Sequence, residues 1–262
     1  MIKLIATDMD GTLLDENGHL PEGFTEVLDL ITKKDVKFVI ASGRPYPTLQ
    51  TNFGPVANRL SYITDNGALV YHNNELIFKD VMDKNVIKDI IKEARKIKNI
   101  AIVLCGVECA YLENFSDEYL EQIHRFYVRY EVVDDISKVE DDIIKVTLCD
   151  LDHAIKNSNS VIEPLFGNNF NVVITDKFWL DITNKTVNKG TALRKIMEHG
   201  NIIKEETMAF GNYYNDIEML NEAEYSFVMK NAPEDMKQHS KYIAESNEDY
   251  GVLGAIMEHV VV

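Results

Sequence analysis

Two aspartates near the start of the chain have the types and spacing needed for chemistry. The apolar run at residues 2–6 predicts a buried strand, and Asp8 and Asp10 lie at its end, followed at once by Gly11 and Thr12. Two neighbouring carboxylates repel each other unless a cation or a shared proton compensates. Mg²⁺ suits the position, because it is usually held by one or two carboxylates with phosphate and water. A carboxylate can also act as a nucleophile and form an aspartyl phosphate. The alternative is an acidic turn after an edge strand.

Three more polar clusters follow apolar segments or begin a predicted helix later in the chain. They are Ser42 after the predicted strand 36–41, Lys189 at the start of a helix, and Asn212, Asn215 and Asp216 after the predicted strand 207–210. If one parallel sheet holds these strands, all the clusters meet at its carboxyl edge, where ligands bind in α/β folds. Together they supply a nucleophile, an acid, phosphate donors, a cation and metal ligands, which are the components of phosphoryl transfer.

The order of predicted elements divides the chain into three segments. Residues 1–81 and 186–262 alternate strands with helices, which indicates a parallel sheet, whereas residues 82–185 repeat helix, strand, strand three times. That repeat is typical of an antiparallel sheet backed by helices. We therefore predict an α/β fold with a parallel-sheet, Rossmann-like core in two parts, 1–81 and 186–262, and a large inserted α+β domain, 82–185. Predicted helices include 116–128 and 152–166 in the insertion, one capped by Asn188, and a terminal helix over 248–259.

Composition excludes several classes of partner. The 262 residues carry 27 Lys and Arg against 43 Asp and Glu, a net charge of −16, which argues against nucleic-acid binding. No basic region followed by an apolar stretch opens the chain, and no segment approaches the ~18 apolar residues of a membrane span. The three cysteines contain no C-x-x-C pair, so neither a disulfide framework nor a cysteine metal site is expected. We expect a cytoplasmic protein that binds neither nucleic acid nor membrane.

Four short motifs, in order, resemble those of the haloacid dehalogenase superfamily of phosphatases, and specifically its Cof-type sugar-phosphatase branch. They are Asp8-Met9-Asp10-Gly11-Thr12, Ser42-Gly43-Arg44, Lys189-Gly190 and Gly211-Asn212-Tyr213-Tyr214-Asn215-Asp216. The Asn66-Gly67 turn and the insertion before Lys189 fit the same branch. The resemblance thus spans the whole chain and implies that the inserted domain is a cap.

The resemblance also implies a role for each motif. Asp8 attacks phosphorus, and Asp10 protonates the leaving oxygen and later deprotonates water. Lys189 is the third catalytic residue and, with Ser42, holds phosphoryl oxygens. The implied substrate- and phosphate-binding residues are Met9, Gly11, Thr12, Ser42, Gly43, Arg44, Asn66, Lys189 and Asn215. The implied ligands of a Mg²⁺ cofactor are Asp8 through its side chain, Asp10 through its backbone carbonyl, Asn212 and Asp216.

Several of these residues have a structural alternative. Ser42 could be a helix cap, and Lys189 could be a solvated lysine in a first helical turn, where its charge opposes the helix dipole. Arg44 could bind substrate or pair with an acidic residue. Thr12 is expected to be a structural loop donor rather than a catalyst.

One residue departs from the family pattern. The family commonly has aspartate as a metal ligand where this chain has Asn212. An asparagine offers a carbonyl oxygen without charge, so we expect weaker Mg²⁺ binding, and loss of catalysis is an open alternative.

The function predicted from the sequence is that of a Mg²⁺-dependent phosphatase acting on small phosphorylated metabolites such as sugar phosphates, as a monomer or weak homo-oligomer. Two alternatives are a phosphomutase of the same superfamily and a non-catalytic regulatory protein that binds a phosphometabolite. The mutase would need contacts for a second phosphate, and the sequence shows no basic cluster in the insertion. The regulatory alternative is suggested by Asn212 alone.

Overall fold

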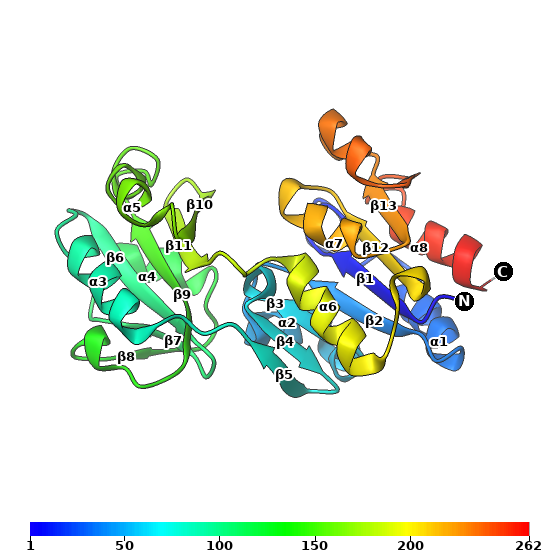
Figure 1. Cartoon of the computed structure of the whole chain (residues 1–262), viewed down its shortest axis with the longest axis horizontal. Coiled ribbons are helices and arrows are strands. Elements are labelled where there is room, and N and C mark those ends of the chain that lie inside the picture. The colour runs from blue at the N-terminus through cyan, green and yellow to red at the C-terminus, as the bar shows by residue number, and fades with distance from the viewer. Residues whose placement is uncertain (262) are drawn as a thin grey trace. The chain divides into compact units, whose positions relative to one another are not determined.

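The structure is a computed structural model that describes residues 1–261 and contains two compact units (Figure 1). The first unit contains residues 1–78 and the chain from Asn188 onward, and the second contains residues 79–187. The second unit extends a little beyond residues 82–185 at both ends. The reason is local, because the Asp80 carboxylate accepts hydrogen bonds from Asn184 Nδ2 and Thr186 Oγ1, both at 2.6 Å.

An eight-stranded sheet forms the centre of the first unit, in the order β14-β13-β12-β1-β2-β3-β4-β5. Its strands are β1 (Leu4–Asp8), β2 (Lys37–Ala41), β3 (Ser61–Thr64), β4 (Leu69–His72), β5 (Glu75–Lys79), β12 (Thr207–Gly211), β13 (Tyr225–Met229) and β14 (Tyr242–Ala244). Each neighbouring pair from β14 to β3 is parallel, and β4 is antiparallel to β3. The predicted α/β class with a parallel, Rossmann-like sheet is confirmed.

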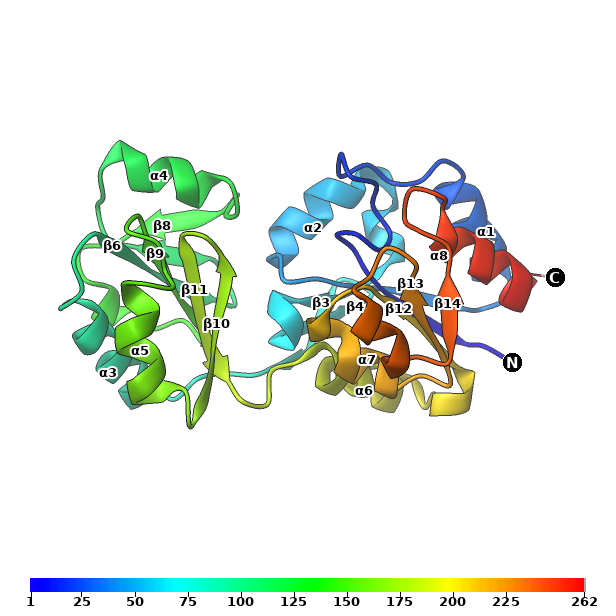
Figure 2. The ribbon, with the colours of Figure 1, turned by 90° about the horizontal axis from the view of Figure 1, so that it is seen from above.

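Helices cover both faces of this sheet (Figure 2). On one face lie α1 (Phe24–Lys33), α2 (Tyr46–Phe53) and α8 (Gly251–Ile256), and on the other lie α6 (Lys189–Gly200) and α7 (Ile217–Asn221). Short helical turns are η1 (Gly54–Arg59), η2 (Asp65–Gly67), η4 (Lys204–Glu206), η5 (Tyr214–Asp216), η6 (Glu234–His239) and η7 (Met257–Val261). Successive strand side chains point to opposite faces, so Val39 joins the core against α6 while Phe38 packs edge-on against Phe24 of α1, with ring centroids 5.6 Å apart.

The terminal helix begins later than predicted. Residue 248 was the expected start, but α8 starts at Gly251, because Tyr250 adopts a left-handed conformation with φ of 55°. A Cβ atom at Gly251 would lie 2.0 Å from the Glu245 carbonyl oxygen. The close turn before the helix therefore depends on glycine, and the helical path continues as η7 to Val261.

A six-stranded sheet forms the centre of the second unit, in the order β10-β11-β9-β6-β7-β8. Its elements are α3 (Lys84–Ala94), β6 (Ile100–Gly106), β7 (Ala110–Leu112), α4 (Asp117–His124), β8 (Tyr130–Val132), η3 (Ile136–Lys138), β9 (Ile143–Asp150), α5 (Ser158–Phe166), β10 (Phe170–Asp176) and β11 (Trp179–Asn184). The expected antiparallel pairing is wrong for one pair, since β7 and β8 are parallel. The connection between them contains α4, and a crossover of that length permits parallel pairing, which a tight hairpin does not.

The two helices predicted over 116–128 and 152–166 are shorter in the structure. The first ends at His124, and the second begins at Ser158. Before Ser158 the chain turns around the buried Asp150 carboxylate, which accepts hydrogen bonds from the backbone N–H groups of Asp152 (3.0 Å) and Ser158 (2.8 Å). Because these backbone N–H groups bind the Asp150 carboxylate, the helix predicted to begin at residue 152 begins only at Ser158.

The second unit has its own core. On one face of its sheet, α3 and α5 pack against Leu104 and Leu148. On the other face, the ring of Trp179 contacts that of Tyr127, which follows α4. The same face holds a buried ion pair, in which Lys145 Nζ lies 3.4 Å from Asp181 Oδ2. Among residues 1–261, no helix has the length and apolar character that crossing a membrane requires.

Candidate active site

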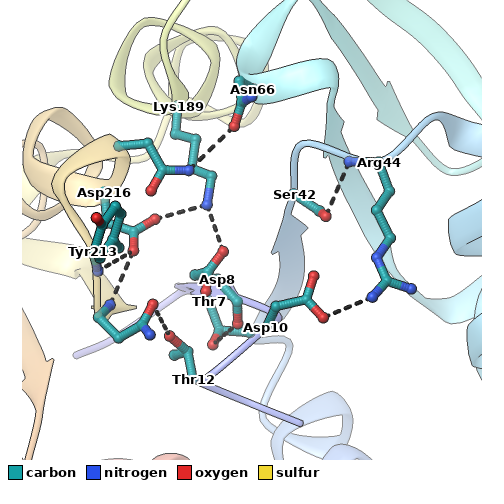
Figure 3. Close-up of polar contacts among 12 residues, drawn as sticks. Thr7, Asp8, Asp10, Thr12, Ser42, Arg44, Asn66, Lys189, Tyr213 and Asp216 are labelled. Atoms are coloured by element: carbon teal, nitrogen blue, oxygen red, sulfur yellow. Dashed lines mark hydrogen bonds and ion pairs between the residues drawn. The ribbon is translucent and has the colours of Figure 1, made fainter. Parts of the chain in front are cut away.

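The parallel register brings the predicted strand-end residues to one edge of the first unit's sheet. β1 lies between β2 and β12, and Asp8 at the end of β1 is in register with Ala41 of β2, one residue before Ser42. Figure 3 shows Asp8, Ser42, Lys189 and Asp216 around a common space, approached from different elements. The structure therefore brings all four sequence clusters together.

Lys189 is the buried centre of this edge. Its side chain is fully buried, and its Nζ donates to Asp8 Oδ1 at 2.5 Å and to Asp216 Oδ1 at 2.7 Å (Figure 3). The second oxygen of Asp216 accepts hydrogen bonds from the backbone N–H groups of Asn212 (2.9 Å) and Tyr213 (3.1 Å). The alternative of a solvated lysine is wrong, and Asp216 connects Lys189 to the loop after β12.

Burial and charge act in opposite directions on these groups. Burial, together with the neighbouring Asp216 charge, raises the pKa of Asp8 to about 6, although Lys189 opposes the shift. Burial on its own would lower the pKa of Lys189, but Asp216 and Asp8 outweigh it and raise that pKa instead. Lys189 is therefore a permanent cation, and the pKa of Asp8 lies only a little below neutral pH.

Close backbone approaches place Lys189 at the site. Asn188 caps α6, as predicted, by accepting a hydrogen bond from the Thr191 N–H group at 2.7 Å. Gly67 has a φ of +108°, and a Cβ atom there would lie 2.3 Å from the Asn188 carbonyl oxygen. At Gly190 a Cβ atom would lie 2.5 Å from the Glu218 backbone. Glycine at both positions allows the start of α6 to pack directly against the turn after β3 and against α7.

The loop after β1 is held by its own backbone and by Asn212. Gly11 has a φ of +76°, and a Cβ atom there would lie 2.4 Å from Asn212 Nδ2. Thr12 Oγ1 donates to Asn212 Oδ1 at 3.2 Å, so Thr12 joins this loop to the loop after β12 and has the structural donor role expected of it. The Met9 side chain is fully buried, and its carbonyl accepts from the N–H groups of Leu13 and Leu14. Met9 can therefore contact a ligand only through its backbone.

Ser42 and Arg44 form a turn rather than a helix cap. The Ser42 hydroxyl accepts a hydrogen bond from the Arg44 N–H group at 3.2 Å, whereas α2 begins at Tyr46 with Pro45 as its capping residue. The capping alternative for Ser42 is therefore wrong, because the helix starts too late. Of the two roles considered for Arg44, the structure shows the acidic pairing, with Nη2 2.7 Å from Asp10 Oδ1.

Asn66 and Asn215 connect two loops at the same edge. Asn66 has a φ of 56°, and its Oδ1 accepts from Asn215 Nδ2 at 3.2 Å. A Cβ atom at Gly43 would lie 3.1 Å from Asn66 Nδ2, so the small residue leaves room for that side chain. These amides link the turn after β3 to the loop after β12, and substrate binding by Gly43, Asn66 and Asn215 stays a prediction.

Two residues at this edge were missed in the sequence. Asn231 Nδ2 donates to the Gly11 carbonyl oxygen at 2.8 Å, and Asn247 Nδ2 donates to that of Leu14 at 2.9 Å. Asn231 follows β13 by two residues, and Asn247 follows β14 by three. Like Asp8, both are polar residues that follow an apolar strand, and this position is the signal in the sequence that identifies them.

The oxygen donors of this edge fit a hard divalent cation. The Asp8 carboxylate, the Asp10 carbonyl and the Asn212 amide oxygen are the donor types that Mg²⁺ takes, with phosphate and water completing its shell. Asp216 is less available, because Lys189 and two backbone N–H groups occupy its oxygens. Within residues 1–261, no three His, Cys, Asp or Glu side chains are grouped as metal ligands. A cation here would depend on one carboxylate, that of Asp8, together with the Asp10 carbonyl and Asn212.

The comparison with known families decides the relationship. The sequence model of the haloacid dehalogenase-like hydrolases matches residues 5–256, almost the whole chain. The chain belongs to this family. The resemblance found in the four motifs is thereby confirmed, and it covers the haloacid dehalogenase-like core and the inserted unit alike.

Relatives within the haloacid dehalogenase-like hydrolases are named phosphatases. The chain is 31% identical over 257 residues to the 5-amino-6-(5-phospho-D-ribitylamino)uracil phosphatase YbjI of Escherichia coli, covering 97% of this chain and 95% of the relative. It is 25% identical over 267 residues to YitU of Bacillus subtilis, which carries the same enzyme name. This match covers 98% of this chain and 97% of the relative. The predicted enzyme class, a phosphatase, is confirmed.

Solved structures agree with this assignment. TM0651 of Thermotoga maritima has a TM-score of 0.87 at 28% identity, covering 98% of this chain and 97% of that one. SMU.1108c of Streptococcus mutans has a TM-score of 0.84 at 30% identity, with both chains fully covered. Both likenesses extend over the core and the insertion of the haloacid dehalogenase-like fold.

Proposed function

We propose that this chain is a Mg²⁺-dependent phosphatase that hydrolyses small phosphorylated metabolites of the sugar-phosphate class through an aspartyl-phosphate intermediate. The observation that carries the proposal is the Asp8 carboxylate, held at the end of β1 and 2.5 Å from the buried Lys189 ammonium. The names of YbjI and YitU add support for the substrate class, because their substrate carries its phosphate on a ribityl chain.

Asp8 and Asp10 divide the chemistry between them. An Asp8 oxygen forms a bond to phosphorus while the bond from phosphorus to the leaving oxygen breaks, and Asp10 gives its proton to that oxygen. Asp10 then takes a proton from water, whose oxygen attacks phosphorus and releases Asp8 and inorganic phosphate. Lys189 opposes the negative charge that collects near Asp8 in both steps.

The other residues bind and orient the phosphoryl group. Ser42 and the backbone N–H groups near Met9–Gly11 are proposed to contact its oxygens. A bound Mg²⁺ would be held by Asp8, the Asp10 carbonyl and Asn212, and it would neutralise negative charge on the phosphoryl group. Asp216 acts on Lys189 and on the loop after β12, to which it is hydrogen-bonded.

The second unit, residues 79–187, is proposed to be a cap that selects the substrate. It has its own sheet and core, and it is inserted in the chain between β5 and α6. Replacing it with the corresponding segment of a relative should change the order of preferred metabolites while p-nitrophenyl phosphate remains a substrate. An unchanged order of preference would contradict the cap assignment.

The function is tested by measuring phosphate release from p-nitrophenyl phosphate and from a panel of sugar phosphates, with and without Mg²⁺. We expect Mg²⁺-dependent turnover and, after rapid quenching, a phosphorylated peptide containing Asp8. Transfer of phosphate to a second position of a sugar phosphate would instead indicate a mutase. Tight metabolite binding without turnover by the folded protein would indicate the regulatory alternative.

A further inference from the structure

The Arg44 guanidinium is held from two sides. Its Nη2 donates to Asp10 Oδ1 at 2.7 Å (Figure 3). Its Nη1 donates to Asn52 Oδ1 at 2.9 Å when the Asn52 amide is oriented to satisfy both of its ends. In that orientation Asn52 Nδ2 donates to the Thr48 carbonyl of its own helix, α2, at 2.8 Å. A continuous series of hydrogen bonds therefore connects α2 to Asp10.

Asp10 needs an external support because its surroundings do not fix it. Its side chain is 55% exposed and lies in a loop, so packing alone leaves several staggered rotamers accessible. The ion pair with Arg44 is exposed too, and such pairs contribute little free energy by themselves. A guanidinium anchored at its other end loses less freedom when it binds a carboxylate. Figure 3 shows the second Asp10 oxygen pointing away from Arg44.

We propose that Asn52 is a positioning residue for Asp10. Asn52 fixes the Arg44 guanidinium against α2, and Arg44 fixes one oxygen of the Asp10 carboxyl, leaving the other for the leaving group. Asn52 lies outside the four motifs and touches none of the reacting atoms. This inference rests on the proposed phosphatase function, in which Asp10 delivers a proton to the leaving oxygen.

Two substrates with different leaving groups can distinguish a misplaced acid from a general loss of structure, because only one of the leaving groups needs a proton. An alkyl phosphate such as a sugar phosphate releases a strongly basic alkoxide, which must be protonated as its bond to phosphorus breaks. The p-nitrophenolate ion departs without a proton. A defect in the position of Asp10 should therefore slow the phosphorylation of Asp8 by the alkyl substrate and leave its phosphorylation by p-nitrophenyl phosphate almost unaffected. The later hydrolysis step, in which Asp10 acts on water, is the same for both substrates, so the comparison uses kcat/KM, which reports the phosphorylation step.

The principal variant is Asn52→Ala in the full-length protein with saturating Mg²⁺. General acid catalysis contributes ~10²–10⁴-fold, and we expect loss of the support to remove about 5- to 10-fold of this in kcat/KM for a sugar phosphate. The change in kcat/KM for p-nitrophenyl phosphate should stay within about twofold. Asn52→Asp keeps an oxygen acceptor for Arg44 and should restore most of the sugar-phosphate rate. Thr51→Ala, an exposed change on the same helix, is the matched control and should leave both rates unchanged.

A double-mutant cycle tests whether Asn52 acts through Asp10. In an Asp10→Asn background, Asn52→Ala should cause no further loss with the sugar phosphate, because the acid it positions is gone. Additive losses would overturn the proposal. Equal losses on both substrates, or a rise in KM on both, would also overturn it, because they indicate a structural role or substrate binding by Arg44.

Failure of the proposed function would look different. In that case the wild type would release no phosphate from either substrate, or Asp8→Asn would remain active. Crystal structures of the wild type and Asn52→Ala then decide the positioning question without turnover. The contact between Arg44 and Asp10 should be lost or shifted in the variant, and an identical contact in both would overturn the inference.

Discussion

Each unit of the chain buries a lysine beside an aspartate, and the two sites differ in their balance of charge. In the first unit, the fully buried Lys189 contacts two carboxylates, those of Asp8 and Asp216. In the second unit, the Lys145 side chain is 6% exposed and pairs at 3.4 Å with Asp181, which also accepts a hydrogen bond from Thr147 Oγ1 at 2.8 Å. One site carries an excess negative charge, and the other is balanced.

The difference follows from where the residues lie on their sheets. Lys145 and Asp181 belong to neighbouring antiparallel strands, where a pair of opposite charges is a normal means of stabilising a sheet. Asp8 lies at a strand end, Lys189 at a helix start and Asp216 at the end of the short helical turn η5, so three elements converge on one point. An uncompensated carboxylate is costly to bury, and its raised pKa is the kind of perturbation that marks functional sites.

The largest predicted effect is on turnover. Asp8→Asn keeps the shape of the side chain but removes the attacking charge, so kcat should fall by at least ~10³-fold. Because burial disfavours the charged form of Asp8, the same change should leave the unfolding temperature unchanged or higher. Asp181→Asn in the second unit should do the reverse, with a lower unfolding temperature and activity on p-nitrophenyl phosphate retained. Similar effects of the two changes on both measurements would contradict the contrast between the sites.

Removal of either lysine should destabilise the protein, but to different extents. Lys189→Met leaves two carboxylates without their buried cation and should lower the free energy of unfolding by about 3–5 kcal/mol. Lys145→Met leaves one carboxylate that is 14% exposed and should cost about 1–3 kcal/mol. Denaturant titrations at pH 7 give both values. An equal or larger loss for Lys145→Met would show that the excess charge of the first site is compensated elsewhere.

The pH dependence reports on Asp8. Its pKa is raised to about 6 by burial and by Asp216, so kcat/KM should fall about tenfold for each pH unit below that value, as the nucleophile becomes protonated. A bound cation favours the carboxylate, so raising Mg²⁺ should move this acid limb to lower pH. Asp181→Asn should leave the limb in place. If the acid limb of the pH profile does not move when Mg²⁺ is raised, the cation does not bind beside Asp8.

The same shift has a consequence for stability. The pKa of Asp8 in the folded protein lies above 3.8, the ordinary pKa of an aspartate, which applies in the unfolded chain. The folded protein therefore binds this proton more tightly than the unfolded chain does. The contribution of this group to the free energy of unfolding therefore declines as the pH rises from about 4 to about 6. Asp8→Asn removes that slope, which a comparison of unfolding curves across this range would detect.

The smallest predicted effect concerns metal affinity. Asn212→Asp adds a carboxylate next to Thr12 and Gly11, and a carboxylate is a stronger ligand for Mg²⁺ than an amide. A net gain of ~1 kcal/mol would lower the half-saturating Mg²⁺ concentration about fivefold, with less change in rate at saturation. Asn169→Asp, an exposed position in the second unit, controls for the added charge. An unchanged half-saturation would exclude Asn212 from direct contact with the ion.

Local pattern was sufficient for the main elements and for the motif residues. Alternating apolar segments predict the parallel sheet of the first unit, because a buried strand needs a continuous apolar run and a crossover helix needs an amphipathic one. Asp8, Ser42 and Asp216 follow apolar segments and are therefore predicted to lie at one edge, since parallel strands in register end together. The predicted helix starts were less accurate. The buried Asp150 carboxylate decides the first turn of the helix that begins at Ser158, and the left-handed Tyr250 decides that of the helix that begins at Gly251.

The sequence by itself predicted which residues would carry the chemistry and that they would meet at one sheet edge, since their types and their places at the ends of apolar segments or at a helix start are local properties of the chain. It left open whether Ser42 caps a helix, whether Lys189 is solvated and whether Arg44 meets an acid. The tertiary structure decided these questions, because each depends on the distance between elements that are far apart in the sequence. Lys189 is buried because Gly67 and Gly190 admit the start of α6, and Arg44 meets Asp10 because two loops converge on the same sheet edge. Burial and charge pairing arise only when the chain is folded, and these set the ionisation of Asp8.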